Sequence, residues 1–400
     1  MFFPLSADSR ALLAAEAAAL ADRTDPLPAL AKELADRRHG PWRAVVVGQD
    51  RDSVTGRLRA VAAGEPSSGA ATGEVVTTGN AVWVFSGHGS QWTGMGRALL
   101  DGEPAFAAEI GRLAPLIAAE AGFSLHDALS GTAEGIEQVQ PSLFAMQLGL
   151  AAAWRAHGAE PAAVIGHSMG ETAAAVVAGA LSTADGVAVI CRRSRLMRRV
   201  AGTGAMAMVA LPWDTVDAEL ADVPEVTVAA HSGPTSTVVA GGRDRVRTLV
   251  ERWAARDLMA KLVPVEVASH SPLVEPILAD LGTELSGLRP APARVPVYST
   301  VLPDPKSPAA FDAAYWTANL RRPVRFSAAV QAALDDGHRA FVEISPHPLL
   351  AHALRENAGD REAAVLSSIR RGGDALLRFR TQVGALHCAG APVSFRPPAA

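Results

Sequence analysis

The 400-residue sequence has almost none of the residues that cross-link small secreted proteins. Its two cysteines, Cys191 and Cys388, lie far apart and match neither a metal-site spacing nor a disulfide framework. We therefore expect a protein of a reducing compartment that binds no metal. The chain is long enough to bury a core that needs no such cross-links.

Long apolar runs and an excess of one charge are also absent. No uninterrupted apolar stretch reaches the roughly 18 residues of a membrane span, and the N-terminal MFFPL lacks the layout of a signal peptide. The net charge is only −4, so no general attraction to nucleic acid or to a membrane surface is expected. With 49% apolar residues, the sequence predicts a folded cytoplasmic protein of two or three domains.

Residues 1–78 are expected to form a small α/β unit. Apolar residues recur at helical spacing over residues 6–37, which predicts two helices, the second capped by Asp25. A strand at 43–47 and a helix at 52–62 follow. The stretch 65–78 is rich in glycine, serine and threonine, so we place a domain boundary there.

The stretch AAVIGHSMGE at residues 162–171 organises the rest of the chain. An apolar run ends at Gly166, one serine follows in a G-x-S-x-G pattern, and a helix is expected over 172–181. In a nucleophile elbow, a serine lies at a sharp strand-to-helix turn whose glycines avoid collisions with the neighbouring backbone. Ser168 is therefore the candidate nucleophile. The alternative is an ordinary turn that happens to hold a serine.

Such a serine needs an oxyanion site. The backbone N–H of Met169 would open the following helix, where unpaired N–H groups favour negative charge. A second N–H is expected from the glycine-rich loop at 86–91, between a buried strand at 81–85 and a helix that opens near Trp92. We assign this second N–H to His88.

A change of pattern marks an inserted domain at residues 202–266. The elements alternate as strand, helix, strand, strand, helix and strand, which is the order of a ferredoxin-like unit. We expect it to interrupt a large α/β-hydrolase-like subdomain, with a parallel sheet, made of residues 79–201 and 267–372. Further strands of that sheet are expected at 295–299 and, as the last one, at 340–344.

Ser168 also needs a base, and histidine has a suitable pKa near neutrality. Of the eleven histidines, His167 is adjacent, but neighbours at an elbow point apart. His270 follows the inserted domain directly, at the expected mouth of the crevice between the domains. It is the candidate base, and a helix-capping or surface histidine is the alternative.

Five motifs carry a resemblance to a known family. They are VFSGHGSQ at 84–91, GHSMGE at 166–171, RSR at 193–195, VASHS at 267–271 and FVEISP at 341–346. In this order they resemble the acyltransferase domains of type I polyketide synthases, modular or iterative, which are relatives of malonyl-CoA:acyl-carrier-protein transacylases. Residues 1–78 then resemble the linker domain after a ketosynthase, and residues 373–400, with a helix capped by Asp374, the linker after the acyltransferase.

The resemblance implies roles for individual residues. Ser168 resembles the acylated nucleophile and His270 its base. Arg193 resembles the arginine that grips the free carboxylate of the extender unit, a task that suits a planar guanidinium. Gln140 resembles a glutamine that lines the pocket, and Arg322 holds the place whose backbone carbonyl orients the histidine. The family needs no acidic third member of a triad.

The selectivity motif before His270 leaves the extender unit open. In the family, serine directly before this histidine goes with methylmalonyl units, and an aromatic residue there goes with malonyl units. Ser269 therefore favours methylmalonyl. However, Val267 stands where the methylmalonyl form usually has tyrosine, and Met169 matches the residue that follows the nucleophile in malonyl enzymes.

The implied activity is transfer of a malonyl or methylmalonyl unit from acyl-CoA to the phosphopantetheine thiol of an acyl carrier protein. No metal or bound cofactor is implied, and the expected partners are the carrier protein, the ketosynthase and other synthase domains. One rival is a thioesterase or esterase of the α/β-hydrolase type, which predicts a downstream acid and no buried arginine. The other is a catalytically idle docking module.

Overall fold

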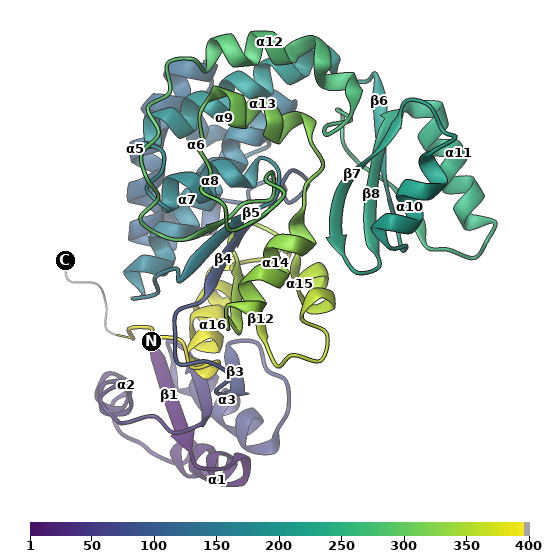
Figure 1. Ribbon diagram of the computed structural model, residues 1–400. Coiled ribbons are helices and arrows are strands. Elements are labelled where there is room, and N and C mark those ends of the chain that lie inside the picture. The colour runs from purple at the N-terminus through teal and green to yellow at the C-terminus, as the bar shows by residue number, and fades with distance from the viewer. Residues whose placement is uncertain (396–400) are drawn as a thin grey trace.

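The computed structural model describes residues 1–395, in which an N-terminal domain, a large lobe and a small lobe can be distinguished (Figure 1). The N-terminal domain is an antiparallel sheet of order β1-β2-β3 whose core is shared with the helices beside it. Its elements are β1 (Phe2–Ala7), α1 (Arg10–Ala21), α2 (Leu27–Ala35), β2 (Trp42–Val47), α3 (Arg51–Ala63) and β3 (Ala70–Glu74).

One prediction for this domain was wrong in detail, and two strands were missed. Strand β1 was not predicted, and neither was β3, which lies inside the glycine-, serine- and threonine-rich stretch 65–78. Strand β3 packs against α16 (Ala375–Cys388), where a Cβ built on Gly73 would lie 3.4 Å from the Cβ of Cys388. Asp25 does not cap α2, because its carboxylate accepts a 2.7 Å hydrogen bond from Arg23 and Pro26 is the capping residue.

The large lobe is built on a parallel sheet of order β10-β5-β4-β11-β12. Its strands are β4 (Val82–Phe85), β5 (Ala163–Gly166), β10 (Val297–Tyr298), β11 (Ala340–Glu343) and β12 (Ala364–Ser367). Successive residues of β4 enter different cores: Trp83 packs with α5 and α7 on one face, and Val84 packs with α14 and α15 on the other. The central strands are therefore buried on both faces.

Helices cover both faces of this sheet (Figure 1). The helices of the large lobe are α4 (Arg97–Gly102), α5 (Pro104–Ala121), α6 (Leu125–Ser130), α7 (Ile136–Ala156), α8 (Gly170–Val177), α9 (Thr183–Met197), α12 (Glu275–Glu284), α13 (Ala313–Arg321), α14 (Phe326–Asp335), α15 (Ala351–Ala358) and α16 (Ala375–Cys388), of which α12 and α13 pack in a separate cluster with α9. The prediction that residues 340–344 form the last strand was wrong, because β12 follows it. The helix expected near Trp92 begins only at Arg97, after a turn.

The small lobe contains β6 (Gly204–Val209), α10 (Trp213–Leu220), β7 (Val226–Gly233), β8 (Ser236–Gly242), α11 (Arg243–Ala254) and β9 (Ala260–Val263). This is the element order expected from the sequence. The strands form an antiparallel sheet of order β7-β8-β6-β9. Ala207 and Val209 of β6 pack into the core with α10 and α11, so Met206 and Met208 lie on the opposite face of the sheet.

Helix α16 joins the N-terminal domain to the large lobe. The Asp374 carboxylate accepts from the N–H of Leu377 at 2.9 Å, as the predicted cap requires. Phe379 and Val383 enter the large core, and a Cβ on Gly384 would lie 2.8 Å from Val45 of β2. The last five residues of the predicted C-terminal linker, 396–400, lie outside the described residues. Among residues 1–395, no helix combines the length and apolarity that crossing a membrane requires.

Candidate active site

Ser168 lies in the tight turn between β5 and α8. Its φ is 54°, the left-handed region that non-glycine residues occupy at some cost in free energy. The flanking glycines have no room for a side chain: a Cβ on Gly166 would overlap the backbone of Glu171, and one on Gly170 would overlap the carbonyl of Phe85. Close packing of the turn against β4 therefore lifts the Ser168 side chain out of the sheet and into a cavity.

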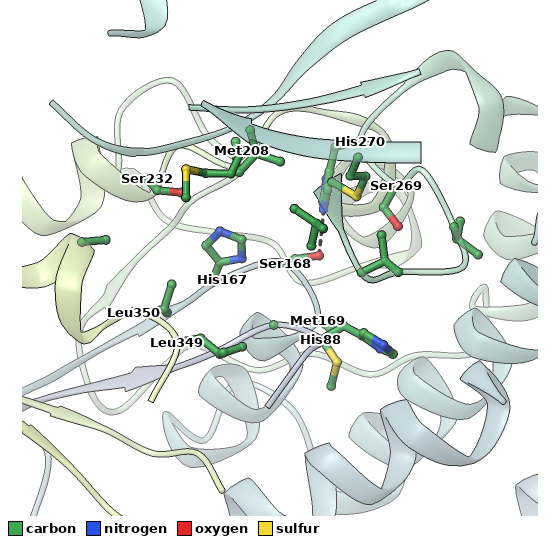
Figure 2. A pocket seen from close by; sticks show the side chains of 18 of the residues that line it. His88, His167, Ser168, Met169, Met208, Ser232, Ser269, His270, Leu349 and Leu350 are labelled. Carbon is green, nitrogen blue, oxygen red and sulfur yellow. Dashed lines mark hydrogen bonds between the residues drawn. The ribbon is translucent and has the colours of Figure 1, made fainter. Parts of the chain in front are cut away.

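The Ser168 hydroxyl is hydrogen-bonded to an imidazole from a distant part of the chain. His270 Nε2 lies 2.8 Å from Ser168 Oγ, and His270 Nδ1 lies 2.8 Å from the backbone oxygen of Arg322 (Figure 2). A carbonyl oxygen only accepts, so Nδ1 carries the proton. Nε2 is therefore left with its lone pair facing the hydroxyl.

Burial keeps His270 neutral. The side chain is almost fully buried, and this burial, with the charge of Arg193 nearby, lowers the pKa of His270 to about 3. The residue also adopts a φ of 61°, and its N–H donates to the carbonyl of Leu320 at 3.0 Å. His270 is thus neither a helix cap nor a surface residue, the alternatives that the sequence left open.

Arg193 of α9 is the third group at the hydroxyl. Its Nη2 lies 3.3 Å from Ser168 Oγ, while its buried Nε and Nη1 have no hydrogen-bond partner within residues 1–395. Burial lowers the pKa of Arg193 to about 10, so the guanidinium stays charged at neutral pH. Its neighbours on and after α9 instead pair with carboxylates: Arg192 with Glu120, Arg195 with Glu284, Arg198 with Glu137 and Arg199 with Asp280.

A buried carboxylate that the sequence did not reveal holds this geometry. Glu171, in the first turn of α8, accepts from Thr300 N at 2.6 Å, from Tyr315 at 2.8 Å and from Asn319 at 3.0 Å. The same Asn319 amide donates to the carbonyl of Ser168 at 3.1 Å. Burial raises the pKa of Glu171, and these donors offset part of that effect. Glu171 stands in the GHSMGE motif, but nothing in the sequence indicates partners more than 100 residues away.

The remaining predicted site residues line one cavity of about 510 Å³. It lies between the turn at Ser168 and the inner face of the small-lobe sheet (Figure 2). These residues are His88 and Met169, expected to supply the oxyanion N–H groups, and Gln140, Val267 and Ser269, expected at the acyl pocket. Arg322 contributes its backbone oxygen only.

Methionines contribute a large part of the apolar lining. Five of the eight methionines in the sequence contact this cavity: Met169, Met197, Met206, Met208 and Met259. Methionine side chains are unbranched and polarizable, so they adapt to ligands of different shape.

The expectations of a hydrolase are not met at this site. That rival requires an acid behind the histidine, but a backbone carbonyl occupies the Nδ1 side of His270. It also has no use for a buried cation, yet Arg193 lies beside the hydroxyl.

Comparisons with known proteins show the family of this chain. Residues 82–393 match the family model described as acyl transferase domain. The chain is 50% identical, over 99% of its length, to a mycocerosic acid synthase-like polyketide synthase of Mycolicibacterium smegmatis. It is also 50% identical, over 92% of its length, to a phthioceranic/hydroxyphthioceranic acid synthase of Mycobacterium tuberculosis. It spans 20% and 18% of these relatives.

Solved structures show the same architecture. The acyltransferase domain from module 8 of the salinomycin polyketide synthase superposes with a TM-score of 0.94 at 36% identity, covering 98% of this chain and 96% of the other. The acyltransferase domain of the polyketide synthase PpsC of Mycobacterium tuberculosis gives a TM-score of 0.72 at 42% identity, covering 80% and 98%. The mixed α/β fold with a central parallel sheet is therefore that of polyketide synthase acyltransferase domains.

Replacing Gly170 by alanine should break the turn. The added Cβ would overlap the Phe85 carbonyl oxygen, so we expect the free energy of unfolding to fall by about 3 kcal/mol. Gly111→Ala is the matched control, because it adds a Cβ to a helix at a place with no atom within 4 Å. That control should gain about 0.5–1 kcal/mol. Denaturant titration measures both, and a Gly170→Ala variant as stable as the wild type would contradict this account of the turn.

Proposed function

The chain belongs to the acyl transferase domain family, and from this premise we propose that it carries a malonyl or methylmalonyl unit from CoA to the phosphopantetheine thiol of an acyl carrier protein. The observation that supports this most directly is one hydroxyl with two partners. Ser168 Oγ lies 2.8 Å from a neutral imidazole and 3.3 Å from a buried guanidinium. The first partner suits attack on a thioester, and the second suits an acyl group that bears a carboxylate.

The reaction runs in two half-reactions through an acyl-serine. Ser168 Oγ attacks the thioester carbon while His270 Nε2 takes the hydroxyl proton, and the N–H groups of Met169 and His88 hold the oxyanion. The C–S bond then breaks, and His270 returns the proton to the CoA thiolate. In the second half, His270 takes the proton of the carrier's thiol, whose sulfur attacks the acyl-serine carbon. The ester C–O bond then breaks, and His270 returns the proton to Ser168 Oγ, which regenerates the hydroxyl. The carbonyl of Arg322 stabilises the imidazolium formed in each half.

Arg193 explains why the acyl unit should be acidic. Buried N–H donors without partners are costly, and a carboxylate can accept from two guanidinium N–H groups at once. Gln140 lines the same cavity, and its side-chain NH2 group can donate to a carboxylate oxygen, which supports a place for this side chain at the same subsite. We therefore propose that Arg193 and Gln140 line the end of the cavity that receives the malonyl carboxylate.

The residues before the base leave space at the α-carbon. Val267 and Ser269 line the cavity without an aromatic ring, which supports entry of an α-methyl group as well as of malonyl itself. One methyl group changes selectivity by only about 1–3 kcal/mol, and Met169 on another wall is adaptable. We propose both units as substrates.

The wider assignments are proposals of the same kind. Residues 1–78 would be the linker domain after a ketosynthase, and residues 373–400 the linker after the acyltransferase. Residues 79–201 and 267–372 would form the α/β-hydrolase-like subdomain with its nucleophile elbow, and residues 202–266 the ferredoxin-like one, which the antiparallel sheet order supports. We propose a cytoplasmic synthase in which neighbouring domains and the carrier protein are the partners.

Ser168→Ala should abolish covalent acylation, because no other hydroxyl lies within hydrogen-bonding distance of His270 Nε2 among residues 1–395. Intact-protein mass spectrometry after incubation with malonyl-CoA and methylmalonyl-CoA measures the adduct. Ser286→Ala on the exposed surface is the control and should acylate normally. An acyl adduct on the Ser168→Ala protein would refute the assignment.

Arg193→Ala should turn the enzyme away from acidic acyl groups. Removing a buried, charge-assisted pair should lower the preference for malonyl-CoA over acetyl-CoA about 100-fold in kcat/KM. Arg195→Ala on the same helix, whose guanidinium pairs with Glu284 at the surface, should keep the wild-type preference. Equal preference in the two variants, measured by competition, would argue against the carboxylate role.

The acylation rate should not follow an ordinary histidine titration. Because burial holds the pKa of His270 near 3, the base stays neutral between pH 7.5 and 5.5. We expect the single-turnover acylation rate at saturating acyl-CoA to change less than about twofold, whereas a base of pKa 6.5 would lose about tenfold. Rapid-quench measurements at several pH values decide this, and a tenfold fall would contradict the neutral, desolvated imidazole.

A further inference from the structure

The FVEISP stretch at residues 341–346 has no role in the chemistry described so far. Its Glu343 ends β11 and is fully buried. One carboxylate oxygen accepts from the N–H of Leu349 at 2.7 Å and from the Ser345 hydroxyl at 3.1 Å, and the other accepts from the N–H of Leu350 at 2.9 Å. A carboxylate removed from water is costly unless its oxygens are bonded in this way.

These hydrogen bonds hold the segment of residues 345–350 in place, although it contains no helix or strand. Residues 345–350 lie between the end of β11 and the start of α15, so their N–H groups are not paired in a strand or helix. The carboxylate sits at the N-terminus of α15, where N–H groups and the helix dipole favour negative charge. Two weaker ties complete the segment: Trp92 Nε1 donates to the Pro346 carbonyl at 3.0 Å, and His347 Nδ1 accepts from Arg371 N at 3.2 Å.

The segment forms a wall of the cavity beside the nucleophile. Leu349 and Leu350 both line it, and Leu349 is 40% exposed, so its side chain is open to contact by a bound ligand. A Cβ built on Gly89, next to His88, would lie 3.5 Å from Leu349 Cδ1, so this wall adjoins the glycine-rich loop.

This wall lies away from the acyl end of the cavity. Figure 2 shows Leu349 and Leu350 on the His167 side of Ser168, whereas Ser269 lies on the other side, beyond His270. A thioester that spans the nucleophile has its acyl group on one side and its sulfur-bearing arm on the other. If the acyl group lies toward Ser269, the arm lies along the two leucines.

We propose that Glu343 is a positioning residue, whose carboxylate holds Leu349 and Leu350 as the apolar wall against which the pantetheine arm of the thioester packs. This inference rests on the proposed function, because it needs a thioester at Ser168. Glu343 touches neither Ser168 nor His270, so it acts only through the segment that it holds. Burial raises the pKa of Glu343 to about 7, and the hydrogen bonds from the two leucine N–H groups favour its ionised form.

Glu343→Gln tests the proposal, because it places an NH2 group against an N–H donor and so displaces the wall. We expect the KM for malonyl-CoA and for methylmalonyl-CoA to rise about tenfold, the effect of losing one buried leucine contact, with kcat changed less than about twofold. The ratio of kcat/KM between the two substrates should stay unchanged. Leu349→Ala should give the same KM effect without loss of thermal stability.

Two further variants make the result specific. Glu343→Asp keeps both acceptor oxygens, so its KM should lie close to the wild-type value. This variant also provides a measurement at residue 343 if Glu343→Gln does not fold. Glu362→Gln, at an exposed carboxylate, should behave as wild type. An unchanged KM in folded Glu343→Gln or in Leu349→Ala, or a changed malonyl-to-methylmalonyl ratio, would overturn the proposal. A wild-type chain that forms no acyl-enzyme at all would instead refute the proposed function.

Discussion

The site depends on one buried guanidinium, that of Arg193, which lies within hydrogen-bonding distance of the Ser168 hydroxyl. The buried cation of Arg193 lies near His270, and together with burial it suppresses protonation of the imidazole. The imidazole is thereby kept neutral without an acidic partner behind it, as its proposed role as a base requires. The same cation has unpartnered N–H groups within the described residues, so an acyl group with a carboxylate would satisfy them better than one without. Under the proposed function, one desolvated charge thus bears on both reactivity and choice of substrate.

Such a site needs a rigid frame. Helix α13 and the residue directly after it supply much of this frame. Asn319 donates to the carbonyl of Ser168, Leu320 accepts from the N–H of His270, and Arg322 accepts from the imidazole. Ser168 and His270 are therefore both held by a few consecutive residues at the end of one helix. Glu171 bonds to the same helix through Asn319, which ties the first turn of α8 to this frame. Three hydrogen bonds to one rigid element hold a productive geometry better than contacts to separate loops do.

Much of this site could be predicted from the sequence. The physical reason why a residue could or could not be predicted differs from one residue to the next. Ser168 is revealed by a local pattern, because the turn itself demands the glycines beside it. Arg193 could be singled out only through the family resemblance, since periodicity does not tell which arginine of that helix points inward. Glu171 was missed because its partners lie 129 to 148 residues further along the chain. Strand β3 was missed because its residues are small, β12 because it is short, and β1 because it contains Pro4, a residue that disfavours strands.

Both lobes contribute to the walls of the cavity. His270 directly follows the small lobe in sequence. Its N–H and its ring are bonded to large-lobe residues, while its carbonyl accepts from the Thr227 hydroxyl of the small lobe at 3.4 Å. The shorter hydrogen bonds of His270 therefore tie it to the lobe that holds Ser168. The small lobe contributes Met206, Met208 and Met259 to the opposite wall instead. Under the proposed function, flexible methionines opposite a closely hydrogen-bonded Ser168 and His270 separate the fit of the substrate from the chemistry, so one geometry can serve acyl units of different size.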